Sequence, residues 1–130
     1  MKIALLLSLG LISLLTPCFG QTPSEMDPDV LIGEWTLDLS PQDLTDANFA
    51  IMTITKIKGN SFKGEFYRKG VKIEHAQLNT QLGIIYGALV SRDNSGSYNT
   101  SFYLKDGMLH GSTHAIDKNF LAVWTATQNK

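Results

Sequence analysis

The chain has 130 residues, 11 Lys+Arg against 12 Asp+Glu and a formal net charge of −1. This near-neutral balance, without a basic run, argues against nucleic-acid binding, because clustered positive charge supplies most of the affinity for a phosphate backbone. Beyond a distinct N-terminal segment, the remaining length is enough for one domain and leaves no room for a second.

The N-terminal segment has the pattern of an export signal. A basic start precedes an unbroken run of apolar and small residues, Ile3 to Leu15, and small residues lead on to Gly20. The run is too short to span a bilayer, which takes about 20 residues, but it suits the central region of a secretory signal. We therefore expect residues 1–20 to be a cleaved signal peptide and the mature protein to be secreted or periplasmic. A lipoprotein anchored through Cys18 is an alternative, although Pro17 fits that motif poorly.

Cys18 is the only cysteine, so the expected mature chain has no disulfide, no thiol nucleophile and no cysteine metal ligand. Residues 21–30 are polar, acidic and contain proline, which predicts a flexible N-terminal lead. No amphipathic helical stretch indicates binding to a membrane surface, and we expect no membrane insertion of the mature form.

From residue 31 onward the chain has the rhythm of a β meander. Turn-forming pairs such as Gly59-Asn60 and Asp106-Gly107 separate alternating segments rich in Ile, Val, Thr, Phe and Tyr. Eight short antiparallel strands with tight hairpins favour a single all-β, up-and-down barrel over residues 31–127, because closure removes exposed strand edges. The predicted strands lie near residues 31–39, 48–58, 61–68, 71–78, 81–92, 97–105, 108–116 and 120–127.

Turn lengths predict which side chains face the barrel interior, because residues paired across a hairpin point to the same face. Two-residue turns at Gly59-Asn60, Lys69-Gly70 and Asn79-Thr80, with a three-residue loop at Asn94-Ser95-Gly96, give one continuous inward face. The same register places Met52 and Ile54 outside. The predicted inward side chains are Thr53, Thr55, Phe62, Phe66, Ile73, His75, Gln77, Ile84, Tyr86, Val90, Tyr98, Thr100, Phe102 and Leu104.

The orientation of His110 and His114 depends on the turn at Asp106-Gly107. A two-residue turn points both histidines outward, whereas a three-residue loop ending at Gly107 points them inward together with Ser112. Both turns are common with Asp-Gly. We favour the inward arrangement, because it places Ser112 opposite Trp124, and a small residue beside a large aromatic one packs well.

Neither histidine arrangement predicts a metal site or a catalytic centre. Residues four apart on a strand are about 13 Å apart at the backbone. Zinc ligands lie about 2 Å from the metal, so His110 and His114 do not share an ion. The sequence contains no G-x-S-x-G nucleophile elbow and no glycine-rich phosphate loop. We expect no metal, no cofactor and no enzymatic activity.

The G-x-W motif Gly33-Glu34-Trp35, followed by an eight-strand meander, resembles the calycin-type barrels: lipocalins, fatty-acid-binding proteins and avidins. The resemblance covers residues 31–127 and implies a barrel with a tryptophan closing one end. Two features depart from these families. The last strand has no basic residue to cover Trp35 as in lipocalins, and no tryptophan between Trp35 and Trp124 matches the biotin-walling residues of avidins. The chain is also similar to small exported protease inhibitors of bacteria, although those usually carry a disulfide.

The predicted inward face mixes aromatic and polar side chains, which is typical of a ligand cavity rather than a solid core. We therefore expect an exported carrier or sensor that holds an apolar or mixed-polarity small molecule inside the barrel. The alternative is a protein-binding module, such as a protease inhibitor or an oligomer, supported by the lead and by the outward Met52 and Ile54. The expected cavity-lining residues are His75, Tyr86, Tyr98, Thr100, Phe102, His110, Ser112, His114 and Trp124.

Overall fold

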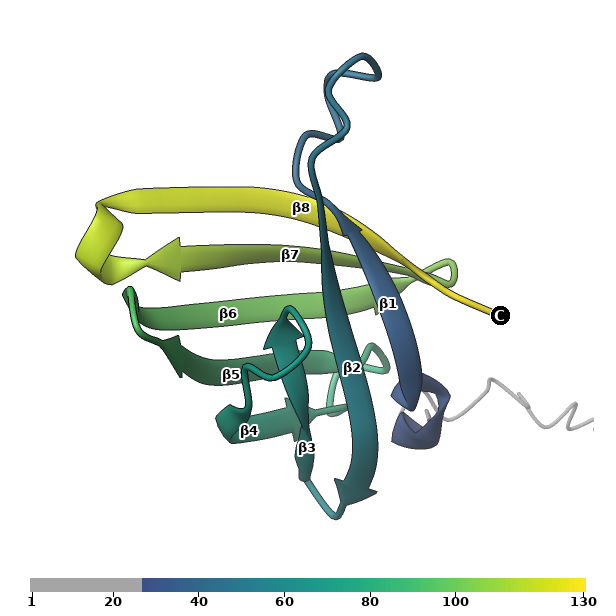
Figure 1. The fold of residues 1–130 in the computed structure, drawn as a ribbon. Helices are drawn as coiled ribbons and strands as arrows, with labels where there is room; N and C mark the ends of the chain where they lie inside the picture. The colour runs from purple at the N-terminus through teal and green to yellow at the C-terminus, as the bar shows by residue number, and fades with distance from the viewer. Residues whose placement is uncertain (1–26) are drawn as a thin grey trace, which may run out of the picture.

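A computed structural model describes residues 27–130 (Figure 1). The expected signal peptide and most of the expected lead lie outside the described residues. All eight predicted strands are present. The strands are β1 (Gly33–Asp38), β2 (Phe49–Lys58), β3 (Ser61–Tyr67), β4 (Ile73–Asn79), β5 (Tyr86–Asp93), β6 (Gly96–Lys105), β7 (Met108–Ala115) and β8 (Phe120–Gln128). Two short 3-10 helices accompany them, η1 (Pro28–Leu31) and η2 (Ile116–Lys118).

The strands form one antiparallel sheet in the order β3-β2-β1-β8-β7-β6-β5-β4, and this sheet curls into a nearly closed barrel (Figure 1). The edge strands β3 and β4 meet at both ends of the seam between them. An isolated bridge joins Glu65 to Lys72, and the backbone N–H of Leu78 donates to the carbonyl of Asn60 at 2.7 Å. The predicted all-β, eight-stranded antiparallel fold is confirmed, with a barrel that is nearly rather than fully closed.

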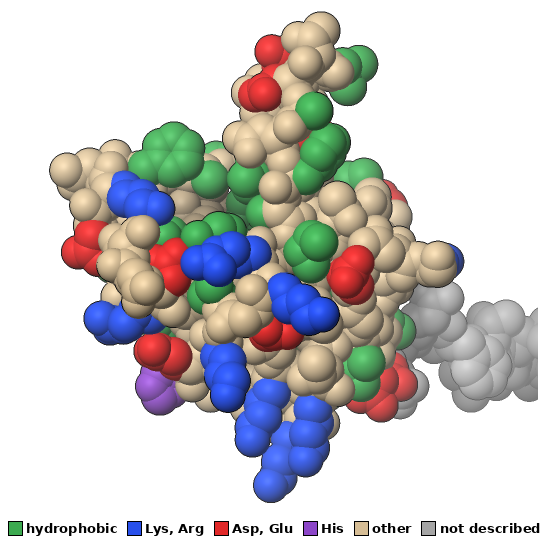
Figure 2. All heavy atoms as spheres, in the orientation of Figure 1, with side chains coloured by type: hydrophobic (Ala, Val, Ile, Leu, Met, Phe, Trp, Pro, Cys, Tyr) green, Lys and Arg blue, Asp and Glu red, His purple; other side chains and the backbone are tan. Residues whose placement is uncertain are grey.

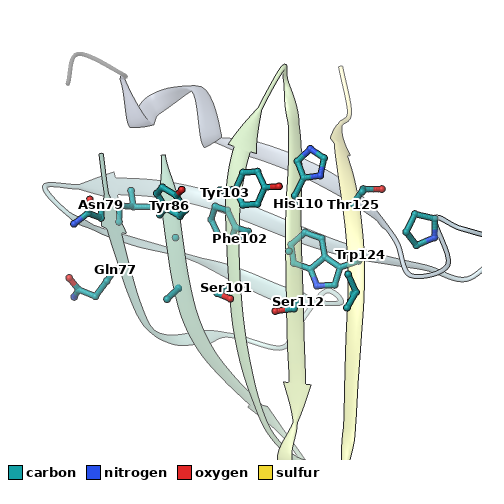
Figure 3. Close-up of a pocket in the computed structure, with 16 residues that line it drawn as sticks. Gln77, Asn79, Tyr86, Ser101, Phe102, Tyr103, His110, Ser112, Trp124 and Thr125 are labelled. Atoms are coloured by element: carbon teal, nitrogen blue, oxygen red, sulfur yellow. The ribbon is translucent and has the colours of Figure 1, made fainter. Parts of the chain in front are cut away.

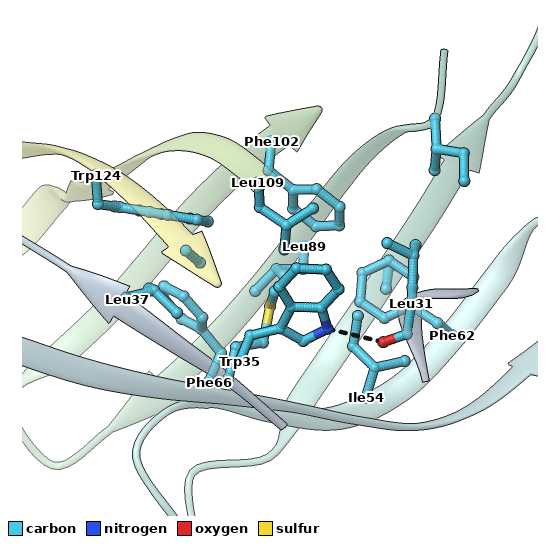
Figure 4. Close-up of a cluster of buried hydrophobic side chains, with 14 of the residues drawn as sticks. Leu31, Trp35, Leu37, Ile54, Phe62, Phe66, Leu89, Phe102, Leu109 and Trp124 are labelled. Carbon is cyan, nitrogen blue, oxygen red and sulfur yellow. Dashed lines mark hydrogen bonds between the residues drawn. The ribbon is translucent and has the colours of Figure 1, made fainter. Parts of the chain in front are cut away.

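The up-and-down strand order gives the barrel two different ends. The connections after β1, β3, β5 and β7 gather at one end, which we call the mouth, while η1 lies at the other end. There the Trp35 side chain is 2% exposed, and its Nε1–H donates to the carbonyl oxygen of Leu31 at 2.9 Å (Figure 4). The prediction that Trp35 is buried is confirmed, and residues 28–30 of the expected lead belong to the helix that covers it.

Aromatic and aliphatic side chains together fill most of the barrel interior (Figure 4). The rings of Phe66 and Trp124 have centroids 6.2 Å apart. Glycines on neighbouring strands make room for these rings: a Cβ on Gly111 would lie 2.4 Å from the Trp124 ring, and one on Gly87 would lie 2.3 Å from the Phe102 ring. The interior therefore relies on large rings lying against bare backbone, and much of it is solid core.

A short hydrogen-bonded chain satisfies the polar groups in this core. The Trp124 Nε1–H donates to Thr113 Oγ1 at 3.0 Å, and the hydroxyls of Thr113 and Thr100 lie 2.9 Å apart. Among the described residues, the hydroxyl of Ser91 is the one buried side-chain polar atom without a hydrogen-bond partner. Most of the buried polar groups are therefore paired, as a stable core requires.

A β-bulge in β2 reverses the predicted faces of that strand. The register with β3 shifts at Thr55, so Met52 and Ile54 point into the core and are at most 1% exposed. Gly64 permits this close approach, because a Cβ there would lie 1.8 Å from the carbonyl oxygen of Thr53. The predicted outward orientation of Met52 and Ile54 is wrong, and so is the predicted inward orientation of Thr53 and Thr55. Burying each large apolar side chain contributes about 1.5–3 kcal/mol, which explains the preference.

A second bulge, between Ile73 and His75 in β4, turns His75 outward. The β4–β5 connection is also longer than the predicted two-residue turn: it spans residues 80–85 and is anchored by Ile85, which is fully buried. Tyr86 follows this loop, points outward and is 40% exposed. The predicted inward orientation of His75 and Tyr86 is therefore wrong. Gln77 and Val90, also predicted inward, share this outer face.

The β6–β7 connection is a two-residue turn. Asp106 and Gly107 have φ angles of 53° and 76°, the left-handed geometry that matches the twist of a hairpin. Phe102 consequently pairs with Gly111 and not with His110. Gly111 therefore faces the interior, and the residues on either side of it face outward. The inward orientation is wrong for three side chains of this strand, which lie on the outer face: His110, Ser112 and His114.

Candidate functional site at the barrel mouth

An apolar cavity of about 210 Å³ lies at the mouth of the barrel, beyond the end of the filled core. Its walls come from the inward faces of strands β1, β2, β3, β6, β7 and β8. Phe120, on the inward face of β8, is 59% exposed and marks where the cavity meets solvent. The lining residues are Leu37, Leu39, Ala50, Phe66, Tyr67, Tyr98, Thr113, Ala115, Lys118, Phe120 and Ala122.

A polar group of five residues borders this cavity, and we call it the mouth cluster: Tyr67, Arg68, Asp93, Tyr98 and Lys118. The Tyr67 hydroxyl donates to Asp93 Oδ2 at 2.7 Å, and the Tyr98 hydroxyl donates to the same carboxylate at 3.1 Å. Lys118 Nζ donates to the Tyr98 hydroxyl at 3.0 Å. On the outer side, Arg68 Nε donates to the Tyr67 hydroxyl at 3.2 Å, and the guanidinium lies 3.9 Å from Asp93.

These contacts shift the ionisation of the cluster. The hydrogen bond from Tyr67 lowers the pKa of Asp93, so this carboxylate stays charged. Burial raises the pKa of Tyr98, whose phenol stays protonated. The hydrogen bond to Tyr98 raises the pKa of Lys118, and the bond to Tyr67 raises that of Arg68. The mouth cluster therefore holds one negative charge, on Asp93, and two positive charges, on Arg68 and Lys118.

Three connections that are distant in sequence, together with Tyr98 on β6, place these groups together. Tyr67 ends β3, and Asp93 ends β5, where its Oδ1 accepts from the backbone N–H of Ser95 at 2.7 Å and so fixes the tight turn. Lys118 ends η2, next to Asn119, whose φ of 50° reverses the chain into β8. Figure 2 shows the resulting surface on the left of the molecule, where hydrophobic side chains lie between basic and acidic ones.

The structure divides the predicted cavity residues between the two faces of the barrel. Tyr98, Thr100, Phe102 and Trp124 are buried and face the interior as predicted, but only Tyr98 lines the mouth cavity. Thr100, Phe102 and Trp124 belong to the packed core beneath it. The other five lie on the outer face: His75, Tyr86, His110, Ser112 and His114.

Three of those outward residues, Tyr86, His110 and Ser112, line a shallow groove across the outer face of β4–β8. The rings of Tyr86 and His110 lie on either side of Tyr103, with ring centroids 5.9 Å and 5.0 Å from the Tyr103 ring. Ser101 and Ser112 form the next row (Figure 3). The groove has a volume of about 800 Å³, and none of the described residues that line it is Lys, Arg, Asp or Glu.

The sequence interpretation missed Asp93 and Lys118 entirely. The signal that was present is topological: in an up-and-down barrel, every second connection lies at the same end. Polar residues at the ends of β3 and β5 and before β8 therefore share the mouth. Their individual orientations follow from turn geometry that the alternation of residues does not encode.

Within residues 27–130, no helix is long and apolar enough to cross a membrane, and no group of three or more His, Cys, Asp or Glu side chains is arranged to hold a metal ion. No family model matches the sequence, and no curated protein is significantly similar to it.

Proposed function

We propose that the protein binds a small, largely apolar molecule in the mouth cavity, as an exported carrier or sensor. The observation that carries this proposal is the apolar cavity itself, next to a core that aromatic and aliphatic side chains fill. Protein interiors are close-packed, and an unfilled apolar space destabilises a fold. A cavity retained at an accessible end of the barrel is consistent with a binding role.

The volume limits the size of the ligand. An apolar cavity of about 150 Å³ holds benzene, and sites for drug-sized ligands measure about 300–1,000 Å³. The mouth cavity, at about 210 Å³, therefore suits a single ring or short branched chain with a few further atoms. A longer molecule would extend past Phe120 into solvent.

The proposal includes export and a calycin-type architecture. Support for export is the basic start and apolar run within residues 1–20, and support for the architecture is the G-x-W motif with a buried Trp35 in an eight-stranded barrel. We expect the mature chain to begin at Gln21. N-terminal sequencing of the exported protein tests this, and an intact Met1 or a lipid on Cys18 would overturn it.

Toluene is a suitable first probe for the cavity, because it matches the cavity in size and carries no polar group. Titration followed by thermal unfolding should show a saturable increase in the melting temperature. At ten times its Kd, a ligand stabilises the folded state by about 1.4 kcal/mol, which corresponds to several degrees for a domain of this size.

Two matched variants locate the binding. Ala122→Leu adds a side chain inside the cavity and should abolish the stabilisation by toluene. Ala88→Leu makes the same change in the outer groove and should leave it intact. An absence of saturable stabilisation in the unmodified protein, or equal stabilisation of both variants, would refute binding in the mouth cavity.

A further inference from the structure

We infer that the ligand of the mouth cavity carries a carboxylate group and that Lys118 binds it. This inference rests on the proposed function and specifies the chemical class of the ligand. The inference depends on two observations: the Asp93 carboxylate already has hydrogen-bond partners within the protein, whereas the Lys118 ammonium group has N–H donors that are not used within the described part of the chain.

Asp93 is already committed within the protein. Its carboxylate accepts hydrogen bonds from the hydroxyls of Tyr67 and Tyr98 and from the backbone N–H of Ser95, and its side chain is 6% exposed. Arg68 approaches this carboxylate from the outer side at 3.9 Å. Asp93 therefore orients the two phenols and partly balances Arg68.

Among residues 27–130, Lys118 forms no salt bridge with a carboxylate. Its ammonium group has three N–H donors, and one is donated to the Tyr98 hydroxyl. The neighbouring acid, Asp117, is engaged elsewhere, since its Oδ2 accepts from the backbone N–H of Ser97 at 3.0 Å. Within the mouth cluster, Arg68 and Lys118 thus carry two positive charges against the single negative charge of Asp93, and of these two cations Lys118 is the one that lines the cavity.

The surroundings of this ammonium group favour an anion. Nζ lies 5.3 Å from the centroid of the Tyr98 ring, and the nearby cavity walls are Phe120, Ala115 and Ala122. Lys118 is itself exposed, so these apolar walls shield a carboxylate at Nζ from water on the cavity side only, and the charge-assisted hydrogen bond there is stronger than one between neutral groups. A carboxylate at Lys118 places the rest of the ligand against these walls, so the cavity accommodates both ends of a small aromatic or branched acid.

Three probes of similar size test the inference: benzoate, benzamide and toluene. Their Kd values are measured by calorimetric or NMR titration of the protein at about pH 7 and low ionic strength. We expect benzoate to bind at least about tenfold more tightly than its neutral isostere benzamide. Added salt should weaken the binding of benzoate and leave that of toluene unchanged.

Lys118→Gln should remove the preference for benzoate over benzamide and leave toluene binding intact. Lys105→Gln is the matched control: it removes the same charge from an exposed lysine at the opposite end of the barrel, and it should leave the preference for benzoate unchanged.

If toluene binds but benzoate binds no better than benzamide, the acidic class is wrong while the proposed function stands. A benzoate preference that survives in Lys118→Gln, or that falls equally in Lys105→Gln, also overturns the role of Lys118. If none of the three probes binds, the proposed function fails and the inference fails with it.

Discussion

Replacing Thr113 by valine removes one hydroxyl from the inner wall of the barrel and keeps the shape of the side chain. In the native structure this hydroxyl accepts from Trp124 Nε1–H at 3.0 Å and lies 2.9 Å from the hydroxyl of Thr100. Trp124 is 1% exposed, so its N–H would have no water to replace the lost acceptor. An unsatisfied buried donor costs about 1–3 kcal/mol, and we expect Thr113→Val to lower the free energy of unfolding by about 2 kcal/mol.

Urea unfolding followed by tryptophan fluorescence measures this loss. With an m value of about 2 kcal/mol/M, the midpoint should fall by about 1 M. Thr127→Val, which removes an exposed hydroxyl from β8, should change the stability by no more than about 0.5 kcal/mol. Thr100→Val should have a smaller effect than Thr113→Val, because it leaves the Trp124 bond in place. A Thr113→Val protein as stable as the Thr127→Val control would refute the role assigned to this hydrogen-bonded chain.

Two further predictions concern the core glycines and the mouth cluster. Gly111→Ala should destabilise the fold by about 1–3 kcal/mol, because the new Cβ would lie 2.4 Å from the Trp124 ring; an unchanged melting temperature would show that the ring moves freely. Asp93 has a pKa below its ordinary value, mainly through Tyr67, so its contribution to stability is present above about pH 4 and is lost as the pH falls through the lowered pKa. The free energy of unfolding should therefore fall more steeply between about pH 5 and pH 2 in the native protein than in Asp93→Asn, and equal slopes would contradict this assignment.

The sequence by itself determined the fold class, the number of strands and their approximate limits. Alternating apolar residues and turn-forming pairs such as Asp106-Gly107 are local signals, and each strand lies within a few residues of where they predict it. Most of the strand order followed as well, because tight hairpins join neighbours; the exception is β3 and β4, which were predicted to pair across Lys69-Gly70 but form the two edges of the sheet. The G-x-W motif also correctly predicted a buried Trp35.

The tertiary structure decided which face of each strand is buried. Side chains on a strand alternate, so a single extra residue reverses every orientation beyond it. Because of the bulge at Thr55, Met52 and Ile54 face the core in place of the predicted Thr53 and Thr55. Because the turn before β7 has two residues, His110 lies on the outer face and not on the predicted inner face. These choices depend on what the opposite strands can pack, and that information is not local.

The mouth cluster depended on tertiary structure for the same reason. Tyr67, Asp93 and Lys118 belong to three different connections, and nothing in the sequence near any one of them identifies the other two as neighbours. They meet because curling the sheet brings alternate hairpin ends to one rim, where hydrogen bonds of 2.7–3.1 Å hold them. Local periodicity therefore determined the strands, whereas closure of the barrel determined the candidate site.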